Sequence, residues 1–246
     1  MEVLAKIVRR YDILLIQEIR DSAGTAIKRL LEKVNSDGSQ FEIMVSDRLG
    51  RGNSKEQYAY FYRASSNVTV LDSYHYDDGD EALGSDTFER EPFTVRFSVP
   101  KTVIGSLSIV GVHVRPDSAV QEIESLRDVY DDVRRKWADD NVLIMGDLNA
   151  DCSYVTKTAM KKLTMRSDFY WPIGDDVDTT VAKTDCAYDS TVPFRFDTVY
   201  GLTPEQTGDV SDHYPIELEL VSRATRTWRH GAYSILCVLL CAKYVF

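Results

Sequence analysis

Residues 143–151 read LIMGDLNAD, an apolar run that stops at a glycine and is followed by acidic and amide side chains. An apolar run of this length fits a buried β-strand, and a rigid strand can present the side chains at its end to a cleft. Asp147 and Asn149 are therefore candidate functional residues. The same two residue types also favour an ordinary capping turn, because their side chains bond to nearby backbone.

Three further segments share the pattern of an apolar strand that ends in an acid or a histidine: LLIQEIRD, IVGVHVRP and VSDHYPIEL. Taken alone, each polar residue has an ordinary explanation as a solvated acid, a half-buried histidine or part of a turn. Their joint occurrence is harder to explain in that way, because strand ends can meet at one shared cleft. The segments cover residues 14–21, 109–116 and 210–218, and the acids and histidines that are candidates in them are Glu18, His113, Asp212 and His213.

The remaining pattern predicts many strands and few helices. The clearest helix is expected over residues 118–137, where Ser118 and Gln121 have capping-box spacing and apolar residues form one stripe. Such an order favours β-sheets that pack on each other with helices on the outside. Shorter helices are expected over residues 4–11 and 23–34, and strands over 12–17, 41–45, 58–62, 68–71, 93–97, 107–112, 142–145 and 216–220.

The composition is that of a soluble globular protein, with 246 residues of which 43% are apolar and 28% charged. The length fits one large α/β domain, which we expect to span residues 1–221. The net charge of −10 argues against a protein that grips nucleic acid by bulk positive charge. It is compatible with a metal-assisted nuclease, in which carboxylates hold a divalent cation next to the phosphate.

The two ends of the chain differ in composition from the segments between them. Residues 1–10 lack an apolar core and a small-residue cleavage site, so we expect no secretory signal peptide in the chain as written. Residues 222–246 form a basic and then apolar tail, in which the apolar part, 232–242, is too short to span a bilayer. This tail fits a lipid-anchor signal loosely, and an alternative terminus explains it better. The four cysteines are too few for a disulfide scaffold.

Seven short strings occur together in an order and spacing that resemble the deoxyribonuclease I family: QEIRD, NSKEQYAYFYR, DTFEREP, VHVRP, MGDLNADCSYV, DTT with CAYD, and SDHYP. The similarity runs from about residue 4 to residue 220. SDHYP also occurs in wider relatives, whereas GDLNADCSYV with DTFEREP and CAYD is much more specific. The resemblance implies a four-layer α/β sandwich of two packed, mostly antiparallel β-sheets flanked by helices. It also implies a metal-dependent endonuclease that hydrolyses DNA phosphodiester bonds and leaves 5′-phosphate ends.

The resemblance further implies a division of catalytic work. His113 is similar to the family's general acid and His213 to its general base, and each imidazole needs a carboxylate to fix its tautomer and raise its basicity. Glu56 matches the partner of His113, and Asp189 matches the partner of His213. Hard oxygen ligands are what Mg²⁺ prefers. The groups that match those holding Mg²⁺ or Mn²⁺, or the phosphate beside the ion, are Glu18, Asp147, Asn149 and Asp212.

Other matches concern DNA, calcium and a disulfide. Arg20 resembles a family arginine that enters the minor groove of DNA, and Arg90 resembles one that meets a phosphate, so little sequence preference is expected. Ser54 stands where the family has a tyrosine, which removes an aromatic contact with the sugar. Structural Ca²⁺ sites map onto Asp78, Asp86, Phe88 (backbone) and Glu91 and onto Asp178, Thr180 and Thr184, and a family disulfide maps onto Cys152 and Cys186.

The resemblance also gives expectations for location and partners. Members of the family are typically secreted, and the expected partner is double-stranded DNA bound by a monomer. Some members bind actin through the segment that matches residues 41–45. Val45 fits that pattern, but Ile43 occupies an aromatic position, so actin is not favoured as a partner.

Two departures from the family pattern leave other functions open. The family begins with a β-strand whose asparagine joins the metal site, whereas this chain starts inside the first helix, so we expect unpaired backbone where that strand belongs. After Asp189 a strand-length block is absent, and a positioning error near 1 Å can cost roughly 100-fold in rate. The alternatives are a catalytically impaired isoform, or a phosphodiesterase or phosphatase of the same fold that acts on another phosphoester.

Overall fold

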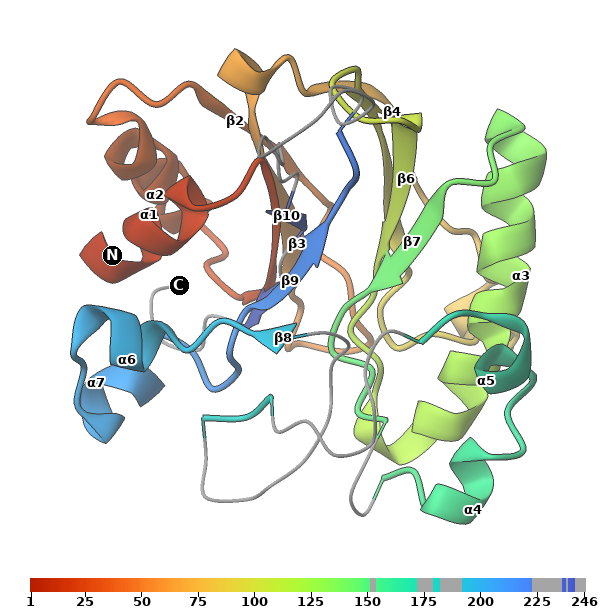
Figure 1. Ribbon diagram of the computed structural model, residues 1–246. Coiled ribbons are helices and arrows are strands. Elements are labelled where there is room, and N and C mark those ends of the chain that lie inside the picture. The colour runs from red at the N-terminus through yellow and green to blue at the C-terminus, as the bar shows by residue number, and fades with distance from the viewer. Residues whose placement is uncertain (151–153, 172–178, 182–191, 223–235, 238, 242–246) are drawn as a thin grey trace.

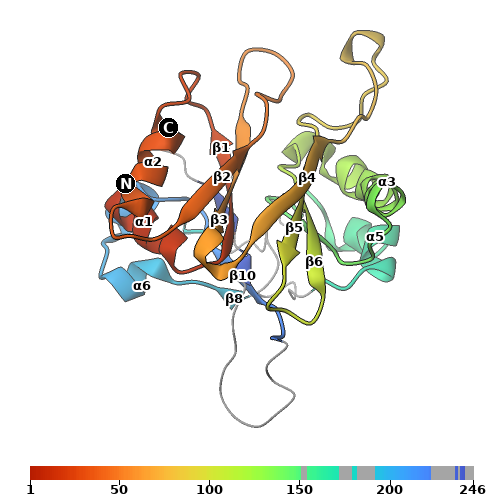
Figure 2. The ribbon, with the colours of Figure 1, turned by 90° about the horizontal axis from the view of Figure 1, so that it is seen from above.

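The computed structural model describes residues 1–150, 154–171, 179–181, 192–222, 236–237 and 239–241. Two β-sheets face each other in the middle of the molecule and helices lie outside them, as Figure 1 and Figure 2 show from two directions. The layers therefore follow the order helix, sheet, sheet, helix. This arrangement, with mostly antiparallel strands, confirms the predicted fold class.

The first sheet has the strand order β11–β1–β3–β2. The pairs β1–β3 and β2–β3 are antiparallel, and β1 pairs with β11 in parallel. All residues of β1 are buried, because the strand has a neighbour on each edge and a packed layer on each face. The bounds are Ile13–Ile19 for β1, Phe41–Val45 for β2, Gln57–Arg63 for β3 and Leu239–Cys241 for β11.

The second sheet has the strand order β4–β5–β6–β7 and is antiparallel except for the parallel pair β6–β7. A third, smaller sheet has the order β10–β9–β8, and both of its pairs are antiparallel. The strands of the second sheet are β4 Thr69–His75, β5 Phe93–Val99, β6 Gly105–Gly111 and β7 Val142–Met145. Those of the third are β8 Val192–Pro193, β9 Ile216–Glu219 and β10 Leu236–Cys237.

Helices cover the outer faces of the two larger sheets. Helices α1 and α2 lie against the first sheet (Figure 2), and α3 lies against the second, where it makes the crossover that a parallel strand pair requires. None of the helices in the described ranges is long and apolar enough to cross a membrane. The helices are α1 Glu2–Arg9, α2 Ala26–Asn35, α3 Ala119–Trp137, α4 Lys157–Met160, α5 Thr164–Asp168, α6 Phe196–Tyr200 and α7 Pro204–Gly208, with 3₁₀ turns η1 Ala64–Ser66, η2 Glu81–Leu83 and η3 Pro116–Ser118.

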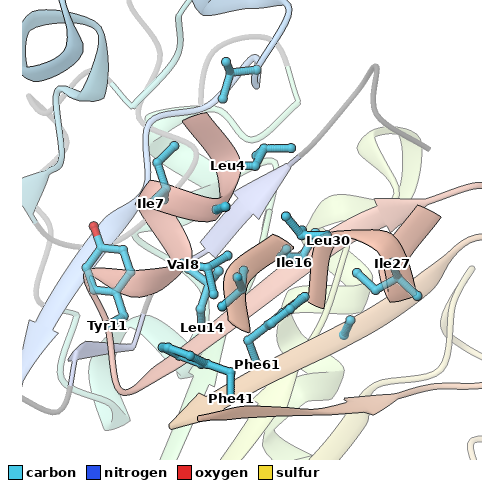
Figure 3. Close-up of a cluster of buried hydrophobic side chains, with 14 of the residues drawn as sticks. Leu4, Ile7, Val8, Tyr11, Leu14, Ile16, Ile27, Leu30, Phe41 and Phe61 are labelled. Carbon is cyan, nitrogen blue, oxygen red and sulfur yellow. The ribbon is translucent and has the colours of Figure 1, made fainter. Parts of the chain in front are cut away.

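Three apolar cores lie between the four layers. On β1, Leu14 and Ile16 pack toward α1 and α2, whereas Ile13 and Leu15 pack toward the second sheet, because successive side chains of a strand point to opposite faces. Figure 3 shows the first core, where Leu14, Ile16 and Phe61 meet side chains of the two helices. The third core lies between α3 and the second sheet. Because the side chains of β1 pack into two cores, the strand is fixed from both of its faces.

One predicted detail of α3 is wrong. The helix itself lies where the sequence predicts it, but Ser118 makes no side-chain cap, and its Oγ donates to Glu122 Oε1 at 2.7 Å. The physical reason is the 3₁₀ turn η3, which leads directly into the helix and leaves Ser118 with φ −118° and ψ 15°. A capping serine needs an extended backbone ahead of the helix, and the turn excludes it.

The edge of β1 that is expected to be unpaired is covered from Leu15 to Gln17. Residues 239–241 lie along it as β11 and pair with it in parallel. Residues 236–237 pair with β9 as β10. Part of the segment that the sequence sets apart as a tail therefore supplies strands to the sheets.

Candidate active site

Two buried histidines face one carboxylate. His113 follows β6, Asp147 follows β7 and His213 lies just before β9, so the ends of three strands bring them together. The Nε2 atoms of His113 and His213 lie 3.8 Å and 3.7 Å from the same oxygen, Oδ2 of Asp147. Both distances exceed an ordinary hydrogen bond. The imidazoles therefore converge on this oxygen without being locked to it.

Glu56 connects His113 to two arginines. Its Oε2 lies 3.0 Å from His113 Nδ1 and 2.8 Å from Arg90 Nε, and its Oε1 accepts from Arg20 Nη2 at 2.8 Å. Burial would raise the pKa of Glu56, but the hydrogen bond with His113 and the nearby positive charges hold it at about 2. Burial likewise opposes a charged His113, yet Glu56 and Asp147 raise the pKa of that imidazole. The pair thus favours a carboxylate beside an imidazolium, which suits a histidine that donates a proton.

Glu18 has an unusual backbone conformation near the end of β1. Its φ is 57°, in a region that few residues other than glycine adopt. The register of β1 against β3 shifts between Ile16 and Ile19, and such an irregularity turns a side chain in a new direction. The Glu18 carboxylate lies 3.0 Å from Arg20 Nη2, so it points toward the same arginine that holds Glu56.

Glu18 and Asp212 bring further negative charge to this region. Burial raises the pKa of Glu18; His113 acts against that shift, while Glu56 and Asp212 add to it. The charges of all three side chains therefore act on the Glu18 carboxyl group. Carboxylate oxygens gathered in this way are the hard donors that a small divalent cation prefers.

The described residues fit a hydrated divalent cation and do not form a finished ligand cage. Within those ranges, no three His, Cys, Asp or Glu side chains stand close enough together to hold a metal on their own. Mg²⁺ is commonly held by one or two carboxylates and keeps several waters. Glu18 and Asp212 suit this mode of binding by one or two carboxylates, and Asp147 lies beside His113 and His213.

The side chains of Asp147 and Asn149 are hydrogen-bonded to backbone groups in and beside the turn after β7. Asp147 Oδ1 accepts from Asn149 N at 3.0 Å, and Asn149 Nδ2 donates to Val114 O at 2.9 Å. The capping-turn and functional interpretations of these residues are therefore compatible. Oδ1 of Asp147 builds the turn, while Oδ2 faces the histidines.

Gly146 allows this turn to form. Its φ is 153°, and a Cβ at this position would lie 1.7 Å from Val112 O. We expect Gly146→Ala to lower the free energy of unfolding by about 3 kcal/mol or more, because the clash and the strained backbone add up. In the control Gly24→Ala, φ is 62° but no atom lies within 4 Å, so about 1 kcal/mol for the left-handed backbone is expected. Urea unfolding measures both losses, and equal values would contradict the importance of the Val112 carbonyl.

Sequence reasoning missed two residues that hold the site. Gln17 Nε2 donates to Val112 O at 2.7 Å, and Gln17 Oε1 accepts from Asp147 N at 2.9 Å. Tyr58 Oη accepts from His113 N at 2.9 Å. A signal for Gln17 was available, since its polar side chain interrupts a buried apolar strand. No such signal marks Tyr58, because it is one of three tyrosines in β3 and the sequence does not distinguish it from the other two.

The two predicted DNA-binding arginines differ in exposure. The side chain of Arg20 is 51% exposed, whereas that of Arg90 is 14% exposed. Both lie against Glu56. Arg20 is thus accessible to a ligand that arrives from solvent, whereas Arg90 is mostly buried beside Glu56.

An arginine lies among the residues predicted to hold the first calcium ion. Arg51 Nε lies 2.9 Å from Asp86 Oδ2, and Arg51 Nη2 donates to the carbonyl groups of Asp86 and Phe88 at 3.3 Å. Asp78 accepts from the backbone N–H groups of Thr87 and Phe88. A guanidinium therefore contacts the oxygens of Asp86 and Phe88, and a calcium ion bound by these two residues would have to displace it.

Several other predicted residues cannot be compared with the structure. Thr180 is described; it is buried and forms a β-bridge with His213. The carboxylate partner of His213, the rest of the second calcium group and the disulfide therefore stay predictions. The residues outside the described ranges are Asp178, Thr184, Asp189, Cys152 and Cys186.

Comparison with known proteins finds one family across most of the chain. A model of the Endonuclease/Exonuclease/phosphatase family matches residues 1–213. The chain is similar to Deoxyribonuclease-1 of Ovis aries, with 44% identity over 236 residues that cover 88% of this chain and 90% of the sheep protein. It is 45% identical to Deoxyribonuclease-1 of Bos taurus, over 88% of this chain and 83% of the bovine protein. Among solved structures, a functionally unknown conserved protein from Enterococcus faecalis V583 shares the fold over 90% of both chains, with a TM-score of 0.56 and 17% identity.

Proposed function

Because the chain belongs to the endonuclease/exonuclease/phosphatase family, within its deoxyribonuclease I branch, we propose that it is an endonuclease that hydrolyses phosphodiester bonds of double-stranded DNA. The observation that carries this proposal is the convergence of His113 and His213 on Asp147 at the ends of three strands. Two histidines so arranged can serve a reaction in which one oxygen loses a proton and another gains one.

The proposed reaction needs two proton transfers. His213 Nε2 accepts a proton from the attacking water, and His113 Nε2 donates its proton to the leaving 3′-oxygen. The P–O3′ bond breaks as the bond from water to phosphorus forms, so the phosphate stays on the 5′ end. Glu56 suits His113 to the acid role, because it accepts the Nδ1–H hydrogen bond and favours the imidazolium. Asp189 is the proposed partner of His213, on the family resemblance.

The ion assigned to this site is Mg²⁺ or Mn²⁺, with Glu18 and Asp212 as ligands and Asp147 and Asn149 beside the phosphate. When bound, such an ion offsets the negative charge of the phosphate oxygens. The raised pKa of the buried Glu18 supports the assignment, since a carboxylate among other carboxylates is costly without a cation.

Arg20 is the proposed contact to DNA. Its half-exposed side chain lies beside Glu18 and Glu56, and the net charge of −10 leaves the chain with little bulk attraction for DNA. Binding therefore depends on a few local cations. Little sequence preference is expected, because the minor groove distinguishes mainly A·T from G·C pairs. Arg90 would meet a phosphate only by giving up part of its contact with Glu56.

Calcium, secretion and the disulfide are proposed on the family resemblance. A Ca²⁺ ion in the loop at Asp86 would have to displace Arg51, so calcium binding there is a competition between the two cations. A secreted monomer with a bridge between Cys152 and Cys186 is the expected form. Actin is not proposed as a partner, because Ile43 stands at an aromatic position of the actin-binding segment.

Nicking of supercoiled plasmid tests the function against its nearest alternatives. The chain is incubated with plasmid and with a panel of inositol phosphates, each in Mg²⁺ and in EDTA. We expect open-circular plasmid with 5′-phosphate ends in Mg²⁺ only, and no phosphate release from the panel. Phosphate release with intact plasmid would assign a phosphatase of the same fold. A folded chain that acts on neither substrate would be a catalytically impaired member of the family.

The pH profile of nicking reports how Glu56 acts on His113. An acid must be protonated, so activity falls as the pH rises through the pKa of His113, and the raised pKa extends activity to higher pH. Glu56→Gln removes the charge that favours the imidazolium. We expect the alkaline limb of kcat/KM to move down by about 1 pH unit or more. The control Glu42→Gln changes an exposed acid that pairs with Tyr62 and should leave the limb in place; a limb that moves up in Glu56→Gln would contradict the acid role.

A further inference from the structure

Residues 236–241 include two short strands that pair with strands leading to the active site. β11 pairs in parallel with β1. β10 pairs in antiparallel fashion with β9, and both of these strands are labelled in Figure 1. The backbone of residues 239–241 is therefore hydrogen-bonded to the first sheet, and that of residues 236–237 to the small sheet. The residue pairs are Leu239 with Leu15, Leu240 with Ile16, Cys241 with Gln17, Leu236 with Glu219 and Cys237 with Leu218.

β1 requires a neighbour on the edge that β11 covers. All of its residues are buried, and buried backbone N–H and C=O groups without a partner cost free energy comparable to a lost hydrogen bond. β3 satisfies one edge of β1, and β11 lies on the other. An apolar strand left with an open edge would also be free to pair with another chain. The pairing with β11 removes both problems along Leu15–Gln17.

Each of the two strands that pair with this segment, β1 and β9, lies next to active-site residues in the chain. Gln17, the partner of Cys241, bonds through its side chain to the backbone of Asp147, and Glu18 follows it directly. On the other side, β9 begins shortly after His213. A shift of β1 relative to β9 would therefore change the position of Glu18 relative to His213.

We propose that residues 236–237 and 239–241, which we call the closing strand, hold β1 and β9 in register and thereby position Gln17, Glu18 and His213. The closing strand acts through these residues and does not contact the reacting atoms. Its effect on rate rests on the proposed function, whereas its pairing with β1 can be measured without any substrate. The two parts can therefore fail separately.

Hydrogen exchange of the unaltered chain, resolved by residue, is the first test. Amides in a paired strand exchange slowly, because exchange needs local opening. We expect protected amides within residues 239–241 and throughout β1, slowed about 100-fold or more relative to an unstructured peptide. Exchange of residues 239–241 at the rate of an unstructured peptide would overturn the proposal, whatever the enzymatic activity.

Proline variants of the full chain test whether the pairing matters. Proline lacks the N–H group and cannot continue a ladder. Leu240→Pro removes the donor of one set of alternate residues, and the double variant Leu239→Pro with Cys241→Pro removes the other. Tyr244→Pro, which follows β11 in the chain, is the control. We expect β1 to exchange about tenfold faster or more in at least one strand variant, with β5 and β6 unchanged; unchanged β1 exchange in both would overturn the proposal.

Kinetics separate a positioning role from a merely stabilising one. In the variant with faster β1 exchange, we expect kcat for nicking to fall about tenfold with KM for plasmid nearly unchanged. A synthetic peptide of residues 233–244 should restore kcat. Faster β1 exchange with unchanged kcat would overturn the positioning role. If the unaltered chain cuts no plasmid, the proposed function fails, and the exchange data still decide whether the closing strand exists.

Discussion

His113→Ala lowers kcat for plasmid nicking by about 10³-fold, with the affinity for DNA retained. The imidazole is buried, its Nδ1 lies 3.0 Å from Glu56, and its raised pKa keeps a proton available for the leaving oxygen. Alanine removes that proton donor. The loss falls on kcat, because the proton is needed in the transition state and not for binding. Initial rates of supercoiled plasmid loss, measured over a range of plasmid concentrations, give kcat and KM separately.

The control for this experiment is His75→Ala. His75 lies in β4, is partly buried and stacks on Phe93 with ring centroids 4.8 Å apart, so its substitution also removes a packed imidazole. We expect the kcat of His75→Ala to stay within about twofold of the parent, since a substitution near the surface and away from the active site has a small effect. A loss below about tenfold in His113→Ala would mean that another group supplies the proton, which contradicts the assignment.

The strands and the longest helix could be predicted because their patterns are local. The run 41–45 is apolar at four of its five positions and is found as β2 with the same bounds, and the stripe over 118–137 is found as α3. Each element is defined by residues within a few positions of one another. The predicted cap of α3 is wrong because the turn η3 sets the backbone of Ser118, and the spacing of Ser118 and Gln121 carries no sign of that turn.

The site was predicted in part because strand ends can share a cleft, and the family resemblance supplied the roles. What the sequence could not provide are contacts between distant segments. Gln17 bonds to residues 95 and 130 positions away, and nothing in a local pattern names those partners. Arg51 pairs with Asp86 across a loop, so a predicted calcium ligand is already satisfied by a cation of the chain. The tail shows only a short apolar run, and its strand partner in β1 is set by which edge is open.

Asp147→Asn removes the negative charge of the carboxylate and keeps the shape of the side chain. We expect it to lower kcat for plasmid nicking by about 10³-fold. Asparagine can still accept the hydrogen bond from Asn149 N, so the turn after β7 is retained. The oxygen that changes lies 3.8 Å from His113 Nε2 and 3.7 Å from His213 Nε2. Without its negative charge the pKa of His113 falls, because Asp147 is one of the charges that raise it. The proposed metal ion also loses a neighbouring carboxylate.

Asp140→Asn is the matched control, because Asp140 is an exposed acid that pairs with Arg134, and we expect its kcat within about twofold of the parent. Titration of the histidines by nuclear magnetic resonance then measures the effect of Asp147 on His113 directly. A lower pKa of His113 together with the lost rate supports a carboxylate that serves both histidines. Full activity despite a lower pKa would reduce Asp147 to a residue that only builds the turn. That is the ordinary interpretation of its sequence, and the position of Oδ2 between two imidazoles argues against it.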